Sequence, residues 1–360
     1  MTTMLTDAMV ANIRVPYALR RVPVSSLASL LPCTQYPLPG DIALARLEKI
    51  GKNARLELTN GRPCNLHEGD LLAVVFGNRY ATQQFEGYAL AEEDGCDLLS
   101  MGGLCGLVKS KHASVAEPTK LRLLGALGDA LGRPLQLHDF ALRSVRTRRQ
   151  PRVIVVCGTS MDSGKTHTAM SLIVGLRRQK QRVASIKLTG TATGKDTWHM
   201  LDAGAAPALD FVDGGFASTY LCNLDELQGL YSLLMGHAAF QGAEWVVVEI
   251  ADGLLQEETA ALLRSPAFTA TVSAWVFATS DPMAAVGGVS VLREWGIEPV
   301  AVSGVISMSP LAMGEARAAT GVTCLTAAEL QSGQLTERLT DPTYGVPPVR
   351  TRQGKLYGVR

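Results

Sequence analysis

The 360-residue sequence carries little charge, few aromatic residues and no ordered arrangement of cysteines. A net charge of +1 gives no strong attraction to nucleic acid or to an acidic membrane surface. The seven cysteines include no C-x-x-C pair and no Cys/His cluster at zinc spacing, which is typical of reduced thiols in a cytoplasmic protein. No apolar run approaches the roughly 20 residues of a membrane span, and the N-terminal segment lacks the apolar core of a signal peptide. We therefore expect a cytoplasmic protein with no nucleic-acid or membrane partner.

The length and the 47% content of hydrophobic residues are sufficient for two domains with a sizeable core. In residues 1–149, short β-rich runs lie between turn residues, at 37–51, 54–66 and 69–81. Asn60-Gly61 is a dipeptide favoured in tight hairpins, because both residues accept positive φ. This spacing predicts a small β-rich domain resembling an antiparallel barrel, with the glycines of residues 100–108 in a turn.

After a basic, proline-containing linker at 143–152, apolar strands alternate with helical stretches. Such alternation predicts an α/β fold with a parallel sheet that helices cover on both faces, at residues 150–338. Residues 339–360 are predicted to be an irregular tail. The expected strands lie at 152–158, 182–190, 243–253, 273–281 and 299–308, and the clearest helices at 224–240 and 282–296.

The strand at 152–158 runs into the stretch GTSMDSGKT, which opens a helix. This is the context that a phosphate-binding loop requires, because free N–H groups at the helix start form a nest for an anion. We expect Lys165 to reach the β- and γ-phosphates and Thr166 to bind Mg²⁺. The predicted cofactor-binding residues are Gly158, Thr159, Ser160, Asp162, Ser163, Gly164, Lys165, Thr166 and His167.

Five residues separate Gly158 from Gly164, where the ordinary Walker A pattern has four. This spacing resembles the loop of dethiobiotin synthetase and of the CobB/CobQ-type amidases, which belong to the SIMIBI division of P-loop NTPases. The stretch GKDTWHMLDAGA at 194–205 resembles a segment of MobB, a nucleotide-binding adaptor of the same division. The resemblance covers residues 152–306 and implies Mg²⁺ with ATP or GTP and a homodimer.

Further site residues follow from the same resemblance. Glu249 ends an apolar strand and matches the synthetase glutamate that contacts Mg²⁺, and Asp252 is a second candidate metal ligand. Lys187 ends another strand and matches the lysine that holds the charged group of the substrate beside the γ-phosphate, where it can neutralise developing charge. Thr189 and Gly190 complete that turn as candidate substrate contacts.

In the MobB-like stretch, Asp196 is a candidate to hold a Mg²⁺-bound water or a substrate amine, and His199 is a candidate to contact the substrate. The guanine motif N-K-x-D is absent, which favours ATP over GTP. No asparagine follows the last strand, so a base contact is expected from Ser303 or from the backbone.

Three functions remain open from the sequence. The first is an ATP-dependent ligase or kinase that activates a carboxylate or carbamate of a small metabolite, with Lys165, Lys187 and Glu249 as catalytic residues. The second is a MobB-like nucleotide switch that presents its β-rich domain to a partner. The third is an N-acyltransferase that uses the loop to hold the pyrophosphate of coenzyme A.

Overall fold

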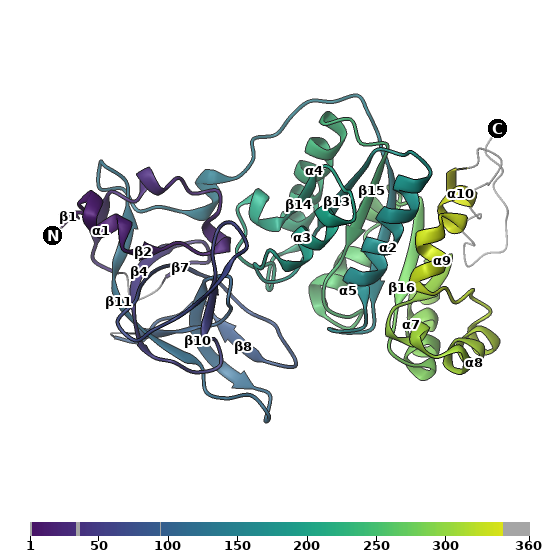
Figure 1. The fold of residues 1–360 in the computed structure, drawn as a ribbon, viewed down its shortest axis with the longest axis horizontal. Coiled ribbons are helices and arrows are strands. Elements are labelled where there is room, and N and C mark those ends of the chain that lie inside the picture. Colours follow the sequence, from purple (N-terminus) through teal and green to yellow (C-terminus); the bar gives the residue numbers. More distant parts are fainter. Residues whose placement is uncertain (1, 34–36, 94, 341–360) are drawn as a thin grey trace. The chain divides into compact units, whose positions relative to one another are not determined.

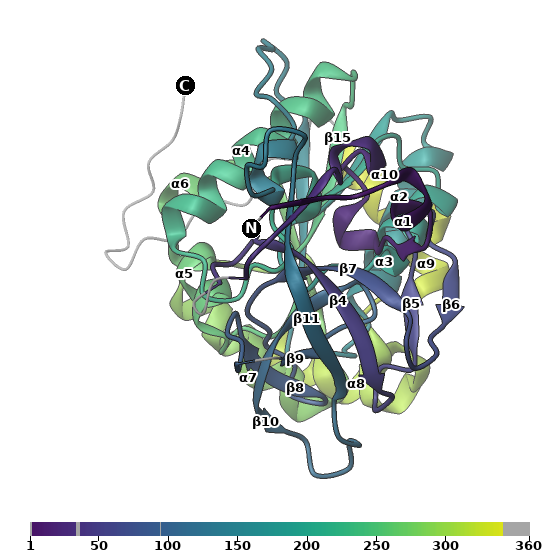
Figure 2. The same cartoon turned by 90° about the vertical axis from the view of Figure 1, so that its left-hand side faces the viewer.

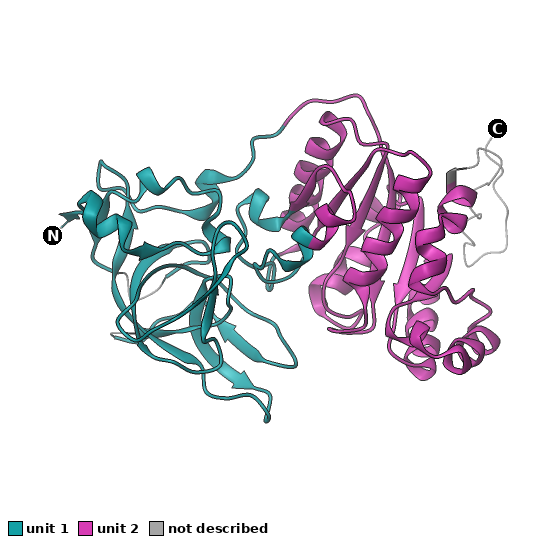
Figure 3. Cartoon of the chain, in the orientation of Figure 1, with its two compact units in different colours: residues 1–144, 189–198, 210–222 teal, residues 145–188, 199–209, 223–360 magenta. Residues whose placement is uncertain are grey.

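The two structural units of this chain are not two continuous halves of its sequence (Figure 3). The computed structural model describes residues 2–33, 37–93 and 95–340 (Figure 1). Unit 1 comprises Met1–Ser144 together with Thr189–Trp198 and Asp210–Cys222, and unit 2 comprises the remainder. Two segments from the C-terminal half of the sequence therefore pack with the β-rich unit.

Unit 1 contains a closed ring of five strands within a nine-stranded sheet. The ring runs through β11 (Thr119–Gly128), β4 (Ile42–Lys49), β7 (Leu71–Phe76), β10 (Leu104–Lys111) and β9 (Gly95–Leu98). It closes because β9 pairs with β11 as well as with β10 (Figure 2). The predicted barrel is therefore present.

The prediction that this barrel is antiparallel is wrong in part. β10 pairs with β7 in parallel, and so does β2 (Ile13–Arg14). Turn signals report only strands that follow one another in the sequence, whereas these parallel pairs join strands that are far apart along the chain.

The remaining strands of this sheet are β1 (Thr3–Met4), β3 (Ser29–Leu31) and β8 (Phe85–Tyr88). The short helices of unit 1 are α1 (Asp7–Ala11), η1 (Tyr17–Leu19), η2 (Val24–Ser26), η3 (Leu137–Phe140) and η4 (Phe211–Gly214).

The two predicted turns of unit 1 are both present. β5 (Arg55–Glu57) and β6 (Pro63–Asn65) pair in antiparallel fashion around Asn60-Gly61, where Gly61 has φ of 82°. The glycine-rich stretch turns only as far as Gly103, with φ of 95°, and continues as β10. Part of residues 100–108 is thus strand rather than turn.

Acidic residues tie the segment 210–222 to unit 1. The hydroxyl of Tyr17 donates to Asp210 at 2.7 Å, and the guanidinium of Arg20 lies 2.7 Å from Asp210 and 2.8 Å from Asp213. Asp210 is 1% exposed, so both of its partners act with little competition from water. This paired charge network explains why the segment belongs to the β-rich unit.

Unit 2 contains a six-stranded sheet in the order β14-β13-β15-β12-β16-β17. The pairs β13/β15, β15/β12, β12/β16 and β16/β17 are all parallel. β13, β15 and β16 are buried at every position, as expected of parallel strands covered on both faces. The α/β prediction is confirmed; the strand bounds are β12 (Arg152–Gly158), β13 (Val183–Lys187), β14 (Ala208–Asp210), β15 (Trp245–Glu249), β16 (Ala274–Ala278) and β17 (Ala301–Ser303).

Local capping sets the two helices that the sequence predicts most clearly. Helix α4 (Leu224–Phe240) begins after Asn223, which forms a capping box with Glu226. Helix α7 (Pro282–Glu294) begins after Asp281, whose side chain accepts from the amide of Ala284. The other helical elements are α2 (Lys165–Arg178), α3 (Lys195–Asp202), which contributes residues to both units, α5 (Glu257–Arg264), α6 (Pro266–Thr269), η5 (Val305–Met308), α8 (Pro310–Thr320), α9 (Ala327–Ser332) and α10 (Gln334–Thr340).

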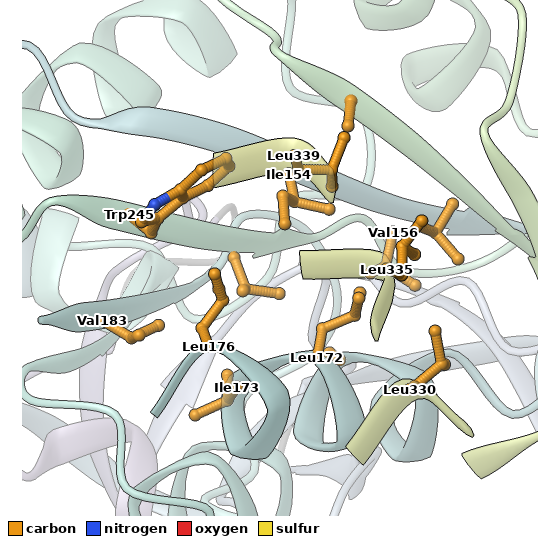
Figure 4. Close-up of a cluster of buried hydrophobic side chains, with 14 of the residues drawn as sticks. Ile154, Val156, Leu172, Ile173, Leu176, Val183, Trp245, Leu330, Leu335 and Leu339 are labelled. Atoms are coloured by element: carbon orange, nitrogen blue, oxygen red, sulfur yellow. The ribbon is translucent and has the colours of Figure 1, made fainter. Parts of the chain in front are cut away.

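The core beneath the sheet joins strands β12, β13, β15, β16 and β17 to helices that include α2, α9 and α10 (Figure 4). Leu172 and Leu176 of α2 belong to one buried cluster with Ile154 and Val156 of β12. Leu330 of α9 belongs to the same cluster, so the helix that follows the phosphate loop packs against both the sheet and α9. This anchoring fixes the start of α2 relative to the end of β12.

The structure also corrects several predicted boundaries: the strands expected at 182–190, 243–253 and 273–281 end at Lys187, Glu249 and Ala278. The strand expected at 299–308 ends at Ser303, because Gly304 has φ of 96° and ψ of −152° and the chain continues as η5. Residues 339–340 of the predicted tail belong to α10, and residues 341–360 lie outside the described residues. Within the described residues, no helix combines the length and apolar character that a bilayer span requires.

Candidate phosphate-binding site

A glycine-bounded loop joins β12 to α2 as predicted. Gly158 is the last residue of β12, and Gly164 precedes α2 with φ of 92°, a left-handed conformation that glycine adopts without strain. Asp162, at the tip of the loop, also has a positive φ of 59°. The amides at the start of α2 are oriented toward this loop, and the strand, loop and helix together form the arrangement of a P-loop domain.

Lys165 lies at the centre of the site. Its side chain is buried, and Nζ donates to the carbonyl oxygen of Ser160 at 2.6 Å. Burial lowers the pKa of Lys165, and the nearby charge of Lys187 lowers it further, while Glu249 and Asp252 act in the opposite direction. An anion that replaces the Ser160 contact would gain a strong charge-assisted hydrogen bond.

Glu249 joins two predicted site residues. The hydroxyl of Thr166 donates to Glu249 Oε1 at 3.0 Å, and Lys187 Nζ lies 3.3 Å from the same oxygen. Glu249 and Lys187 end the neighbouring parallel strands β15 and β13 and face each other in register. Residues that are 83 and 62 positions from Glu249 thus meet at one carboxylate.

The site fits a magnesium–phosphate group. In P-loop proteins Mg²⁺ takes one loop hydroxyl and one strand-end carboxylate, with phosphate and water oxygens as its other ligands. Thr166 and Glu249 provide that pair at hydrogen-bond distance. No group of three or more His, Cys, Asp or Glu suited to a metal occurs in the part of the chain that the structure describes.

Two loop hydroxyls support the same fit. Thr159 Oγ1 and Ser163 Oγ are buried and make no hydrogen bond to any described residue. Buried polar atoms in folded proteins are nearly always paired, so an unpaired pair of donors in one loop calls for a ligand. Phosphate oxygens would accept from both hydroxyls.

Three glycines hold the loop by close backbone contact. A Cβ on Gly253 would lie 2.1 Å from the carbonyl oxygen of Thr159, and one on Gly304 would lie 2.2 Å from that of Ser163. A Cβ on Gly158 would lie 2.6 Å from the hydroxyl of Ser163. Gly253 and Gly304 are functional positions that the sequence analysis missed; the signal was a glycine within four residues of a strand end at each place.

Cys157, next to the loop, does not provide a nucleophile. It is 1% exposed, and burial raises the pKa of its thiol to about 12. The thiolate is the reactive form, so this residue is inert at neutral pH.

The structure places the remaining candidates as follows. Ser160, Asp162 and His167 lie in the loop or at the start of α2, and all three are exposed. Asp252 has φ of 63° and lies near enough to affect the pKa of Lys165. These four residues border the loop as predicted, and the carbonyl oxygen of Ser160 accepts from Lys165 Nζ.

The other candidates belong to the segment that follows β13 and to the end of β17. Thr189, Gly190 and Asp196 belong to unit 1, whereas His199 belongs to unit 2 and lies half-buried in α3. Ser303 is buried, and its carbonyl oxygen accepts from the amide of Thr279 at 3.0 Å. The carbonyl oxygen of Ser303 is thus already paired with the backbone of Thr279.

The start of the MobB-like stretch is held by a carboxylate that the sequence analysis missed. Both oxygens of Glu57 accept from the amide of Gly194, at 3.0 and 3.1 Å, and Oε2 also accepts from the hydroxyl of Thr193. Trp198 packs edge-on against Tyr17, with ring centroids 6.3 Å apart. All of these residues lie in unit 1, so residues 194–198, the start of the stretch, belong to the β-rich unit.

Comparison with known proteins leaves the family open. No family model matches the chain, and no curated protein matches it. The structure resembles the signal recognition particle 54 kDa protein of Aeropyrum pernix K1, solved in complex with GDP, at 22% identity and a TM-score of 0.35; the match covers 54% of this chain and 48% of that one. It also resembles the signal recognition particle receptor FtsY of Elizabethkingia anophelis, solved in complex with GDP, at 13% identity and a TM-score of 0.32, over 45% of this chain and 51% of FtsY. The matches thus span about half the length of those proteins.

Proposed function

We propose that this protein is a Mg²⁺- and ATP-dependent enzyme that activates a carboxylate or carbamate of a small metabolite by phosphoryl transfer. The observation that carries the proposal is the meeting of Thr166 and Lys187 at Glu249, beside the buried amine of Lys165. A phosphate-binding loop alone needs no second lysine. A lysine at the end of the adjacent strand β13 is suited to an acceptor that is itself negatively charged.

Each residue has a distinct task in this proposal. Lys165 leaves the carbonyl of Ser160 and binds the β- and γ-phosphate oxygens, while the free hydroxyls of Thr159 and Ser163 orient them. Thr166 and Glu249 hold the metal, which supplies charge neutralisation on the nucleotide. Lys187, released from Glu249, binds the acceptor carboxylate and stabilises the acyl phosphate as it forms.

A nucleotide switch is the second candidate, and one observation favours it. The chain leaves β13 at Lys187, and residues 189–198 and 210–222 then belong to unit 1. A change at Lys187 on nucleotide binding would therefore pass along the chain into the β-rich unit within two residues. This continuity suits an adaptor that reports nucleotide state, in the manner of MobB.

Binding of coenzyme A by the same loop would serve the acyltransferase alternative. The Thr166–Glu249 pair suits a metal–nucleotide complex, and an acyltransferase has no need of it. The acyltransferase is therefore the third candidate function, and titration with acetyl-coenzyme A tests it.

We further propose a homodimer that forms over the nucleotide face. Large apolar side chains are exposed within six residues of the ends of β15, β16 and β17: Leu255 is 88% exposed, Met283 77% and Met308 84%. Parallel strands bring their carboxyl ends to one edge of a sheet, and exposed large apolar groups are characteristic of an interaction surface. Sedimentation of the protein with and without nucleotide tests this, and a monomer under both conditions excludes it.

The test of the enzyme proposal is calorimetric titration with ATP, GTP and acetyl-coenzyme A in the presence of Mg²⁺, followed by a screen of carboxylate- and amine-bearing metabolites for ADP release. We expect Lys165→Met to weaken ATP binding about 100-fold or more, because it removes a buried charge-assisted contact. Lys187→Met should retain ATP binding and lose turnover. Lys180→Met, at an exposed position two residues after the end of α2, is the matched control.

Each result discriminates between the candidates. Unchanged ATP affinity in Lys165→Met rejects the phosphate site, and turnover in Lys187→Met removes this lysine from the mechanism. Preference for GTP without any metabolite-dependent release supports the switch. Binding of acetyl-coenzyme A alone supports acyl transfer.

A further inference from the structure

Unit 1 contains a cavity of about 400 Å³ that the proposed function does not use. It is lined by the loop that follows β7, by β8, by the end of β10 and by Tyr220. A cavity of this size holds one small metabolite. All of its lining residues belong to unit 1, so its shape depends on that unit alone.

Tyrosine rings form one wall of this cavity. Tyr80 and Tyr220 both line it, with ring centroids 5.5 Å apart, and Tyr88 packs against Tyr220 at 6.4 Å. The rings are half-buried, so each presents part of its face to a ligand. Such a wall binds the hydrocarbon or planar part of a ligand at little cost in conformational entropy, because each ring has only two rotatable bonds.

Opposite charges are also present in the lining. Glu86 lines the cavity, and its two oxygens accept from the hydroxyls of Tyr88 and Ser110, each at 2.6 Å. These hydrogen bonds lower the pKa of Glu86, so it is ionised at neutral pH. They also fix the carboxylate in position, which prepares it to receive a cation.

Lys111 supplies the positive group of the lining. Its Nζ donates to the carbonyl oxygen of Val115 at 2.8 Å and lies 3.2 Å from Glu117, so the ammonium is held in place. Gln84 lies in the same lining, and its side-chain oxygen accepts from Arg79 at 2.7 Å. The amide N–H₂ of Gln84 is then the group that is oriented to donate to an anion.

We propose that this cavity binds a small zwitterion of the α-amino acid type. Glu86 binds its ammonium group, Lys111 and the amide of Gln84 bind its carboxylate, and Tyr80 and Tyr220 contact its side chain. A zwitterion matches both charges of the lining: Glu86 shares its carboxylate between the ligand and its two hydroxyl donors, and Lys111 shares its ammonium between the ligand and Glu117. The inference stands independently of the proposed phosphoryl transfer, since it uses no residue of unit 2.

The experiment is ligand-observed NMR of the full chain with the standard α-amino acids in pools, each at about 1 mM, the weak end of metabolite binding. We expect at least one amino acid to bind, and its decarboxylated and deaminated analogues to bind about tenfold more weakly, because each lacks one charged hydrogen bond. Glu86→Gln should weaken binding of the amino acid by a similar factor. Glu48→Gln, an exposed glutamate on β4 of the same unit, should leave it unchanged.

The possible outcomes are all decisive. No binding by any amino acid to the wild-type protein overturns the proposal, and so does equal binding to wild type and Glu86→Gln. A decarboxylated analogue that binds as well as the amino acid shows a site for cations and rejects the zwitterion. If Glu86→Gln does not fold by circular dichroism, Tyr220→Leu replaces it, with the same tenfold weakening expected.

Discussion

In unit 2, the strands β13, β15 and β16 are buried at every position, whereas in unit 1 the strands β8 and β11 alternate between buried and more exposed residues. The first sheet is parallel where its pairing is described and the second is mixed. The polar side chains that can reach a ligand are therefore expected at different positions along the strands of the two units.

In unit 2 these places are strand ends. Gly158, Lys187 and Glu249 are each the last residue of a strand, and parallel strands bring their ends to one edge. In unit 1 the corresponding groups stand along the strands, as Glu86 and Ser110 do on paired strands. A buried parallel sheet offers chemistry at its edge, and a half-exposed sheet offers it on its face.

The largest effect should come from the packed edge of unit 2. Gly304→Ala combines an unfavourable positive φ with a clash against the carbonyl of Ser163, so we expect a loss of about 3 kcal/mol or more in the free energy of unfolding. Gly69→Ala in unit 1 has a similar φ of 93° but no atom within 4 Å of the new Cβ, and should cost about 1–2 kcal/mol.

Urea denaturation of both variants measures this difference, and ATP titration should show weaker binding for Gly304→Ala only. Equal destabilisation of the two variants would mean that the contact of Gly304 with Ser163 does not hold the phosphate loop. It would contradict the expected difference between the packed sheet edge of unit 2 and the open position in unit 1.

A smaller effect is expected where the MobB-like stretch is tied to unit 1. Glu57→Ala leaves the amide of Gly194 without its buried partner and should cost about 2 kcal/mol. Hydrogen exchange at the amide of Gly194 should accelerate, while the phosphate loop keeps its protection. Glu48→Ala, at an exposed position of the same unit, should change stability by no more than about 0.5 kcal/mol. Unaltered exchange in Glu57→Ala would show that the stretch is held by other contacts.

The smallest effect concerns two glutamates, one in each unit, whose pKa values are lowered by different causes. The pKa of Glu86 in unit 1 lies below its ordinary value of 4.5 mainly because the hydroxyls of Ser110 and Tyr88 donate to it. The pKa of Glu244 in unit 2 is lowered by the backbone amide, the side-chain hydrogen bond and the charge of Arg182. For both residues the stabilising contribution is present above pH 4.5 and is lost as the pH falls through the lower folded-state pKa.

Carboxyl-detected NMR titration at low and high salt measures both residues. Salt screens the charge of Arg182 but leaves neutral hydroxyl donors unaffected, so we expect salt to raise the pKa of Glu244 more than that of Glu86. An equal response in both residues would contradict these assigned causes.

The sequence by itself determined the parts of this protein that depend on neighbouring residues. The phosphate loop from Gly158 to Thr166, the capping of α4 and α7 and the hairpin at Asn60-Gly61 all follow from patterns a few residues long. Backbone conformation and capping are local, so a short pattern is sufficient to predict them.

Only the tertiary structure decided which distant residues meet. Glu249 with Lys187, Gly304 against the loop, and Glu57 at Gly194 each join residues that are 62 or more positions apart, and no sequence period links them. The closure of the barrel through β9 and β11 and the assignment of residues 189–198 and 210–222 to unit 1 have the same origin. Such contacts arise because buried polar groups must be paired and buried surfaces must be closely packed. The partner can be any part of the chain that folds beside them, whatever its separation in the sequence.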